Sequence, residues 1–183
     1  NWVRESAVGQ KSRIAVGVQE LSPFPAGSYT GAISAKNLED MGVTYAILGH
    51  SERRRYFHET DQDVANKVDQ ALANKIMPIV CVDDPYIDSQ AAALSNEALG
   101  KVLVAYEELE AIGSGESSAV GEVLSAQTEI DEAFNEVDVV YGGSVTAENA
   151  QKYAKICQGM LIGGASLKPD SFMAILRETS EIL

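Results

Sequence analysis

Short runs of apolar residues alternate along this chain with longer segments in which apolar residues recur every three or four positions. The short runs are partly β-branched, and that pattern is typical of strands buried in a parallel sheet. We predict six strands, at Arg13–Gln19, Val43–Leu48, Ile76–Cys81, Lys101–Tyr106, Val137–Tyr141 and Met160–Ile162. We predict helices at Ser34–Met41, Asp63–Asn74, Ser118–Asn135, Ala147–Cys157 and Asp170–Ile182, and a further helix that begins at Ser51. Repeated strand–helix units of this kind indicate an α/β fold with a parallel sheet.

Two of the predicted helices carry specific local signals. In the helix at 63–74, one face carries Val64, Val68, Ala71 and Leu72, the spacing expected of a helix that lies on a sheet. Thr146 is a candidate N-cap for the helix that we expect to begin at Ala147. Linkers and low-complexity tracts are not evident, so a single domain over residues 1–183 is expected.

Composition narrows the class of ligand. With 183 residues and 45% hydrophobic residues, the chain is long enough for one domain with a substantial core. A formal net charge of −13 argues against nucleic-acid binding, which needs a basic surface. A small anion remains compatible with this charge, because backbone amides at glycine turns can hold a phosphate without an excess of Lys or Arg.

The two cysteines, Cys81 and Cys157, each lie inside or beside an apolar stretch. We expect two buried thiols in a reduced cytoplasmic protein, with a disulfide as the minority alternative. Two histidines, His50 and His58, and such scattered cysteines do not make a zinc site, so no metal is expected. An apolar span of membrane length and a secretory signal are both absent from the sequence, which favours the cytoplasm and no membrane contact.

Glycines and polar residues follow the ends of four predicted strands. The sequences at these ends are Gly49-His50-Ser51-Glu52, Tyr106-Glu107, Gly142-Gly143-Ser144 and Gly163-Gly164-Ala165-Ser166. In parallel α/β folds, ligands bind at the carboxyl ends of the strands. The amide dipoles of a helix that begins at Ser51 would disfavour a protonated imidazole at His50. Taken alone, His50 could equally be a structural histidine on a loop.

Together these motifs resemble those of the triosephosphate isomerases. The matching segments run in family order from about Arg13 to the C-terminus and read GHSERR, AYE, AIGSG, YGGS and GGASLKP. The resemblance implies a TIM-type (β/α)₈ barrel that interconverts dihydroxyacetone phosphate and glyceraldehyde 3-phosphate through an enediolate, without a cofactor. It makes His50 the electrophile, Glu107 the base and Glu52 a residue that helps to organise the site. For Glu52, a salt bridge to Arg53 or Arg54 is an equally simple account. It assigns substrate binding to Asn1, Gly113, Ser144, Gly163 and Gly164.

The resemblance also implies a homodimer. The segment Pro23–Gly31 matches a loop that reaches the partner's site in the family, although an ordinary Pro/Gly surface loop is the simpler alternative. Counterparts of the family's first helix, second strand and second helix are largely missing between Trp2 and Val3. This pattern fits a shortened family member or a sequence that joins segments across gaps.

Three further departures from the family pattern bear on activity. Val3 replaces an essential lysine, Glu108-Leu109-Glu110 replaces the Pro-Val-Trp hinge of the lid, and Ala32 replaces a glutamate of the dimer contact. Two hypotheses remain open: an isomerase with impaired activity, and a non-catalytic barrel scaffold that still binds phosphate.

Overall fold

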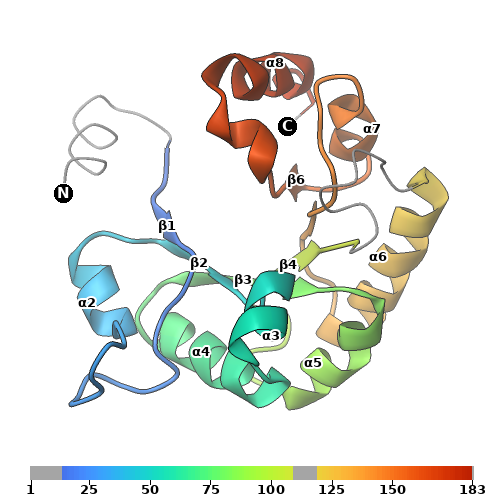
Figure 1. The fold of residues 1–183 in the computed structure, drawn as a ribbon. Coiled ribbons are helices and arrows are strands. Elements are labelled where there is room, and N and C mark those ends of the chain that lie inside the picture. Colours follow the sequence, from blue (N-terminus) through green and yellow to red (C-terminus); the bar gives the residue numbers. More distant parts are fainter. Residues whose placement is uncertain (1–13, 109–118, 183) are drawn as a thin grey trace.

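The computed structural model describes residues 14–108 and 119–182. In this part of the chain six strands form one sheet in the order β1-β2-β3-β4-β5-β6, and each pairs in parallel with the next. Their bounds are β1 (Gly17–Val18), β2 (Tyr45–Leu48), β3 (Met77–Val82), β4 (Leu103–Tyr106), β5 (Val139–Tyr141) and β6 (Gly159–Met160). The prediction of six parallel strands is confirmed. Each strand follows its predecessor in space, and the sheet curls as an open barrel (Figure 1). A closed barrel of this type has eight strands.

Helices connect the strands and cover the sheet. They are α2 (Ala35–Asp40), α3 (Ser51–Phe57), α4 (Asp61–Ala73), α5 (Ile87–Ala93), α6 (Val120–Phe134), α7 (Ala150–Ala154) and α8 (Pro169–Thr179), with 3₁₀ turns η1 (Asp84–Tyr86) and η2 (Gly164–Leu167). Figure 1 shows α4, α5 and α6 following one another along one side of the curled sheet. The helix predicted to begin at Ser51 does begin there. Helices of the described residues are too short or too polar to span a membrane.

The core lies between the sheet and these helices. Helix α4 packs on β2 and β3 through Val64, Val68 and Ala71, which are fully buried as predicted from their spacing. Its first turn is held by a capping box, in which Thr60 and Asp63 each accept a hydrogen bond from the other's backbone N–H. Other members of the core include Ala46, Leu48, Val80, Val104, Val123, Ile130, Phe134 and Ile175. Cys81 and Cys157 are free and buried, as predicted.

Several boundaries differ from the prediction. Strands β1 and β6 stand at the two edges of the sheet, where each is paired on one side, and only two residues of each form the ladder. Helix α5 lies in a segment for which no helix was predicted. Its buried face contains Ile87, Ala91 and the fully buried Gln90. Because Gln90 is polar, it interrupts the apolar periodicity from which a helix would be predicted.

Helix α7 begins three residues later than predicted. The N-cap is Asn149, so the prediction of Thr146 as the cap is wrong. The Thr146 N–H donates to Asn149 Oδ1 at 2.8 Å, and the Ala150 N–H donates to the Thr146 carbonyl at 2.9 Å. An asparagine that bonds the backbone in this way favours a turn over an earlier start of the helix.

Candidate active site

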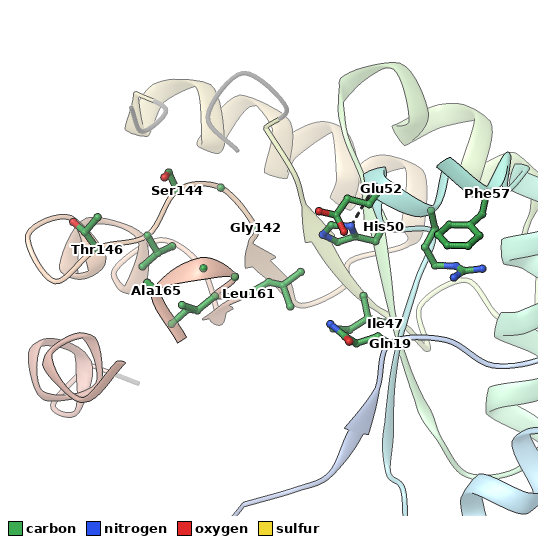
Figure 2. A pocket seen from close by; sticks show the side chains of 16 residues that line it. Gln19, Ile47, His50, Glu52, Phe57, Gly142, Ser144, Thr146, Leu161 and Ala165 are labelled. Carbon is green, nitrogen blue, oxygen red and sulfur yellow. Dashed lines mark hydrogen bonds between the residues drawn. The ribbon is translucent and has the colours of Figure 1, made fainter. Parts of the chain in front are cut away.

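His50 sits at the junction between β2 and α3. Gly49 ends the strand with a φ of 73°, and His50 then becomes the N-cap of α3. The Glu52 N–H donates to His50 Nδ1 at 3.3 Å (Figure 2). Because Nδ1 accepts this hydrogen bond, the neutral imidazole carries its proton on Nε2.

Glu107 follows β4 and is almost fully buried, with 2% of its surface exposed. One carboxylate oxygen, Oε2, accepts a hydrogen bond from the Ser51 N–H at 2.8 Å. The other, Oε1, lies 2.7 Å from His50 Nε2. The fold therefore brings the predicted base and the predicted electrophile into direct contact. Ser51, which also contacts Glu107, lies 56 positions before it in the sequence.

The contact with Glu107 changes the expected ionisation of His50. The close contact with the Glu107 carboxylate raises the pKa of His50 above its ordinary value of 6.5, and the charge of Glu52 acts in the same direction. Partial burial opposes the shift but does not cancel it. The sequence-based expectation that the helix dipole disfavours the protonated form is therefore outweighed here by one carboxylate at contact distance.

A cavity of about 660 Å³ opens beside His50. Its walls are formed by Ile47 of β2 and by residues that follow β1, β2, β5 and β6, so it lies at the carboxyl ends of the strands. Figure 2 shows His50 and Glu52 on one side of this cavity and Ser144 and Thr146 on the other. Glu107 contacts His50 but is not among the residues that line the cavity.

The predicted phosphate-binding residues face the histidine across this cavity. Ser144, Gly163 and Gly164 all line it. A Cβ atom added to Gly163 or Gly164 would have no neighbour within 4 Å, so there is open space beside both glycines. Asn1 and Gly113, which the resemblance also assigns to substrate binding, lie outside the described residues.

Gly142 is a residue of the site whose role the sequence did not reveal. Its N–H donates to the Tyr106 carbonyl at 2.7 Å, which ties the end of β5 to the end of β4. A Cβ at this position would lie 3.0 Å from the Tyr106 carbonyl oxygen and 3.3 Å from Glu107 Cγ. In the sequence, the Gly142-Gly143 pair indicates only a phosphate-binding loop and does not indicate a contact with Tyr106 or Glu107.

A partly buried cluster of charged side chains lies beside the site, and one of its members, Arg53, lines the cavity. Lys67 contacts Glu20 at 2.7 Å and also contacts Glu59, while Arg53 contacts both of these carboxylates. Burial opposes ionisation of Glu59, but Lys67 and Arg53 hold the pKa of this carboxyl below its ordinary value. For Arg53 and Arg54 the sequence suggested only an ion pair with Glu52. Among the described residues, no group of three or more His, Cys, Asp or Glu side chains could hold a metal ion.

A buried carboxylate beside an imidazole, at the strand ends of an open parallel barrel, defines an α/β-barrel enzyme of the acid–base type. Comparison of sequences identifies the family. A model of the family described as triosephosphate isomerase matches residues 3–179. The chain belongs to the triosephosphate isomerase family, whose members are isomerases.

Relatives named triosephosphate isomerase cover most of the chain. The protein of Mesomycoplasma hyorhinis is 41% identical over 180 residues, which cover 90% of this chain and 74% of that protein. The protein of Francisella philomiragia subsp. philomiragia is 35% identical over 206 residues, which cover 99% of this chain and 81% of that protein. The second alignment is longer than the 183 residues of this chain, so that relative contains residues with no counterpart here.

Proposed function

We propose that this chain interconverts dihydroxyacetone phosphate and glyceraldehyde 3-phosphate, with Glu107 as the base and His50 as the electrophile. The observation that carries the proposal is the pairing of Glu107 Oε1 with His50 Nε2 at 2.7 Å, beside a cavity lined by Ser144, Gly163 and Gly164. Names of the relatives support the same reaction. The cavity volume of about 660 Å³ suits a small phosphorylated substrate.

The proposed reaction needs one base and one hydrogen-bond donor. Glu107 removes a proton from C1 of dihydroxyacetone phosphate, and the electron pair forms the C1–C2 double bond of the enediolate. The negative charge then develops on the carbonyl oxygen of C2, where the Nε2–H of His50 donates a hydrogen bond. Return of the proton from Glu107 to C2, with transfer of the hydroxyl proton from O1 to the O2 oxyanion, gives the aldehyde at C1 and the hydroxyl at C2.

Substrate binding must break the contact between the Glu107 carboxylate and the His50 imidazole. In the structure, Glu107 Oε1 lies against His50 Nε2, and Glu107 Oε2 accepts a hydrogen bond from the Ser51 N–H. The carbonyl oxygen of the substrate would take the place of Oε1 as the acceptor from Nε2. The freed carboxylate would then face the substrate carbon. Burial of Glu107 keeps water from competing for the proton.

The phosphate of the substrate is assigned to the opposite wall of the cavity. Backbone N–H groups at Ser144, Gly163 and Gly164 suit an anion because they donate hydrogen bonds without requiring a positively charged side chain. Gly164→Val tests this assignment: the added Cβ meets no protein atom within 4 Å, so the expected loss of inorganic phosphate binding reports ligand exclusion. Gly121→Val, on α6 with equally open space, is the matched control. Unchanged phosphate affinity in Gly164→Val would contradict the assignment.

Steady-state turnover tests the proposed reaction. Parent protein, Glu107→Gln and the control Glu97→Gln are compared in a coupled assay for glyceraldehyde 3-phosphate, Glu97 being an exposed acid outside the site. We expect Glu97→Gln to match the parent and Glu107→Gln to lose at least about 10²-fold in kcat. Equal, near-background rates in the parent and Glu107→Gln, together with retained phosphate binding, would instead support the phosphate-binding scaffold.

We also propose that turnover is lower than in relatives that carry a lysine where this chain has Val3. A missing positive charge of this kind removes roughly 3–4 kcal/mol of transition-state stabilisation, or about 10²–10³ in rate. Val3→Lys is then expected to raise kcat. An unchanged kcat in that variant would remove this explanation.

Dimerisation through the Pro23–Gly31 loop is part of the proposal. Phe24 and Tyr29 stack with ring centroids 4.7 Å apart and remain 47% and 42% exposed. Exposed aromatic residues of this kind are favoured in interfaces. Light scattering should show a dimer that Phe24→Ser weakens, whereas a monomeric parent would contradict the proposal.

We also propose a cytoplasmic location, which the two free thiols support. Cell fractionation tests it.

A further inference from the structure

We propose that Arg54 is a positioning residue for the isomerisation, because its guanidinium holds the Gly49 carbonyl and so fixes the orientation of His50. The inference rests on the proposed role of His50. Arg54 is a residue of α3 with a side chain only 6% exposed, and it does not line the cavity. Any effect on the reaction must therefore pass through its neighbours.

The guanidinium of Arg54 is surrounded by acceptors from four segments. Nε donates to the Gly49 carbonyl at 2.7 Å, and Nη1 donates to Asp61 Oδ1 at 2.6 Å. Nη2 donates to Gln90 Oε1 at 2.7 Å and to the Cys81 carbonyl at 3.3 Å. Its carbon Cζ also lies 4.2 Å from the centre of the Tyr86 ring.

The contacts with Asp61, Gln90 and Cys81 hold the guanidinium in a fixed position beside the Gly49 carbonyl. Gln90 is fully buried and donates its amide Nε2–H to the Asp61 carbonyl at 3.1 Å, so it is fixed in turn. A planar fork with five N–H donors can satisfy all these acceptors together, whereas an ammonium group cannot reproduce the geometry. Arg54 thus joins β3, α4 and α5 to the turn that precedes His50.

The Gly49 residue is held from both sides. Its N–H donates to Glu59 Oε2 at 3.2 Å, and its carbonyl accepts from Arg54. Its φ of 73° favours glycine, and a side chain here would meet its neighbours, because a Cβ would lie 2.9 Å from Arg54 Nη2 and 3.0 Å from Val64. The backbone therefore has little freedom at this turn.

The peptide bond between Gly49 and His50 links the position of the Gly49 carbonyl to the orientation of His50. The Gly49 carbonyl and the His50 nitrogen belong to one rigid plane, so a fixed carbonyl fixes the direction in which the His50 backbone starts. From this start, His50 Nδ1 meets the Glu52 N–H at 3.3 Å and Nε2 meets Glu107 Oε1 at 2.7 Å. Loosening the carbonyl should release the Nδ1 contact and allow both imidazole tautomers.

The test uses Arg54→Lys with Arg55→Lys as the matched control. Arg55 is the next residue of the same helix and is exposed, so the control makes the same chemical change outside the buried contacts. We expect Arg54→Lys to lower kcat by about 10–10²-fold, the loss caused by a catalytic group displaced by about 1 Å, with KM changed less than about threefold. Nitrogen-15 NMR of His50, recorded at a pH well above its raised pKa so that the ring is neutral, should show a protonated Nε2 and a bare Nδ1 in the parent and in Arg55→Lys. In Arg54→Lys it should show mixed tautomers.

Asp61→Asn separates positioning from general stability. This change weakens the Arg54–Asp61 ion pair but leaves the Gly49 contact available, so we expect a lower melting temperature with kcat within about threefold of the parent. If Arg54→Lys does not fold, Gln90→Met perturbs the same guanidinium more gently and should shift the His50 tautomer signals in the same direction.

Three results would overturn the inference: unchanged His50 signals in Arg54→Lys, unchanged signals in Gln90→Met where that variant is needed, or equal losses of kcat in Arg54→Lys and Asp61→Asn. An inactive parent would defeat the proposed reaction. The NMR signals of His50 would still decide whether Arg54 positions the imidazole, so the two failures are distinguishable.

Discussion

At the scale of single residues, the chemistry of the site depends on how close two side chains come. The sequence placed His50 and Glu107 at the ends of strands β2 and β4, and the structure puts both there. Strand β3 lies between those strands in the sheet, so their contact depends on the curl of the sheet and the course of two loops. Neither feature can be read from local sequence patterns, which is why the raised pKa of His50 was not foreseen.

The raised pKa of His50 predicts the acidic limb of the pH–rate profile. In the free enzyme, protonation of His50 strengthens its pairing with Glu107, so the base is occupied and the imidazole is no longer neutral. We expect kcat/KM to fall with decreasing pH around a midpoint above 6.5, because kcat/KM reports groups of the free enzyme. A midpoint at or below 6.5 would contradict this.

The same shift predicts how the stability of the protein depends on pH. A group whose pKa is raised on folding stabilises the folded state fully below its unfolded pKa and loses that contribution as pH rises through the folded value. The difference in unfolding free energy between the parent and His50→Gln should therefore be largest below about pH 6.5 and shrink at higher pH. Denaturant titrations at several pH values measure it, and a difference that grows with pH would refute the assignment.

Gly142 gives a second prediction at this scale. An alanine there would press on the Tyr106 carbonyl and on Glu107 Cγ, at 3.0 and 3.3 Å from the new Cβ. We expect a loss of about 1–3 kcal/mol in unfolding free energy and a fall in kcat of up to about 10²-fold, because the base is displaced. Gly121→Ala is the control, since its Cβ meets nothing within 4 Å and should leave kcat unchanged. Equal kcat values for both variants would show that Gly142 does not position Glu107.

At the scale of elements, strong periodicity was the reliable guide. Helix α4 and strands β2, β3 and β4 appear where apolar spacing predicted them, because each buries a regular set of apolar residues. Helix α5 was not predicted because Gln90 lies on its buried face, where its side chain accepts a hydrogen bond from Arg54 instead of packing in the apolar core. A polar residue recruited to such a contact breaks the pattern that would reveal its helix.

The capping box of α4 gives the prediction at this scale. Thr60→Ala removes the side chain that accepts from the Asp63 N–H and should lower the unfolding free energy by about 1 kcal/mol. Thr128→Ala is the control, because its hydroxyl bonds the Leu124 carbonyl within a helix and is exposed. Chemical denaturation compares the two variants. A loss in Thr128→Ala as large as that in Thr60→Ala would argue against the cap.

At the scale of the whole molecule, the sheet is an open barrel whose interior strands and edge strands differ in the number of neighbouring strands with which they pair. Strands β3 and β4 pair on both sides, and their residues Val80 and Val104 are fully buried. In the described residues, β1 and β6 pair on one side only, over two residues each. The loops after β5 and β6 nevertheless supply Ser144, Gly163 and Gly164 to the cavity. Proposed catalytic residues thus follow interior strands, whereas much of the proposed phosphate site follows an edge.

This asymmetry predicts graded protection against amide hydrogen exchange. Edge strands with few ladder bonds open at lower free-energy cost than interior strands, so amides of β6 should exchange well before those of β3 and β4. Inorganic phosphate should slow exchange at residues 163–166 and in β6 while leaving β3 unchanged, because a ligand stabilises the segments that it contacts. Exchange measured by mass spectrometry with and without phosphate tests both statements. Uniform protection across the sheet would show that the open edge does not weaken the fold, and protection by phosphate confined to β1 would place the anion on the wrong side of the cavity.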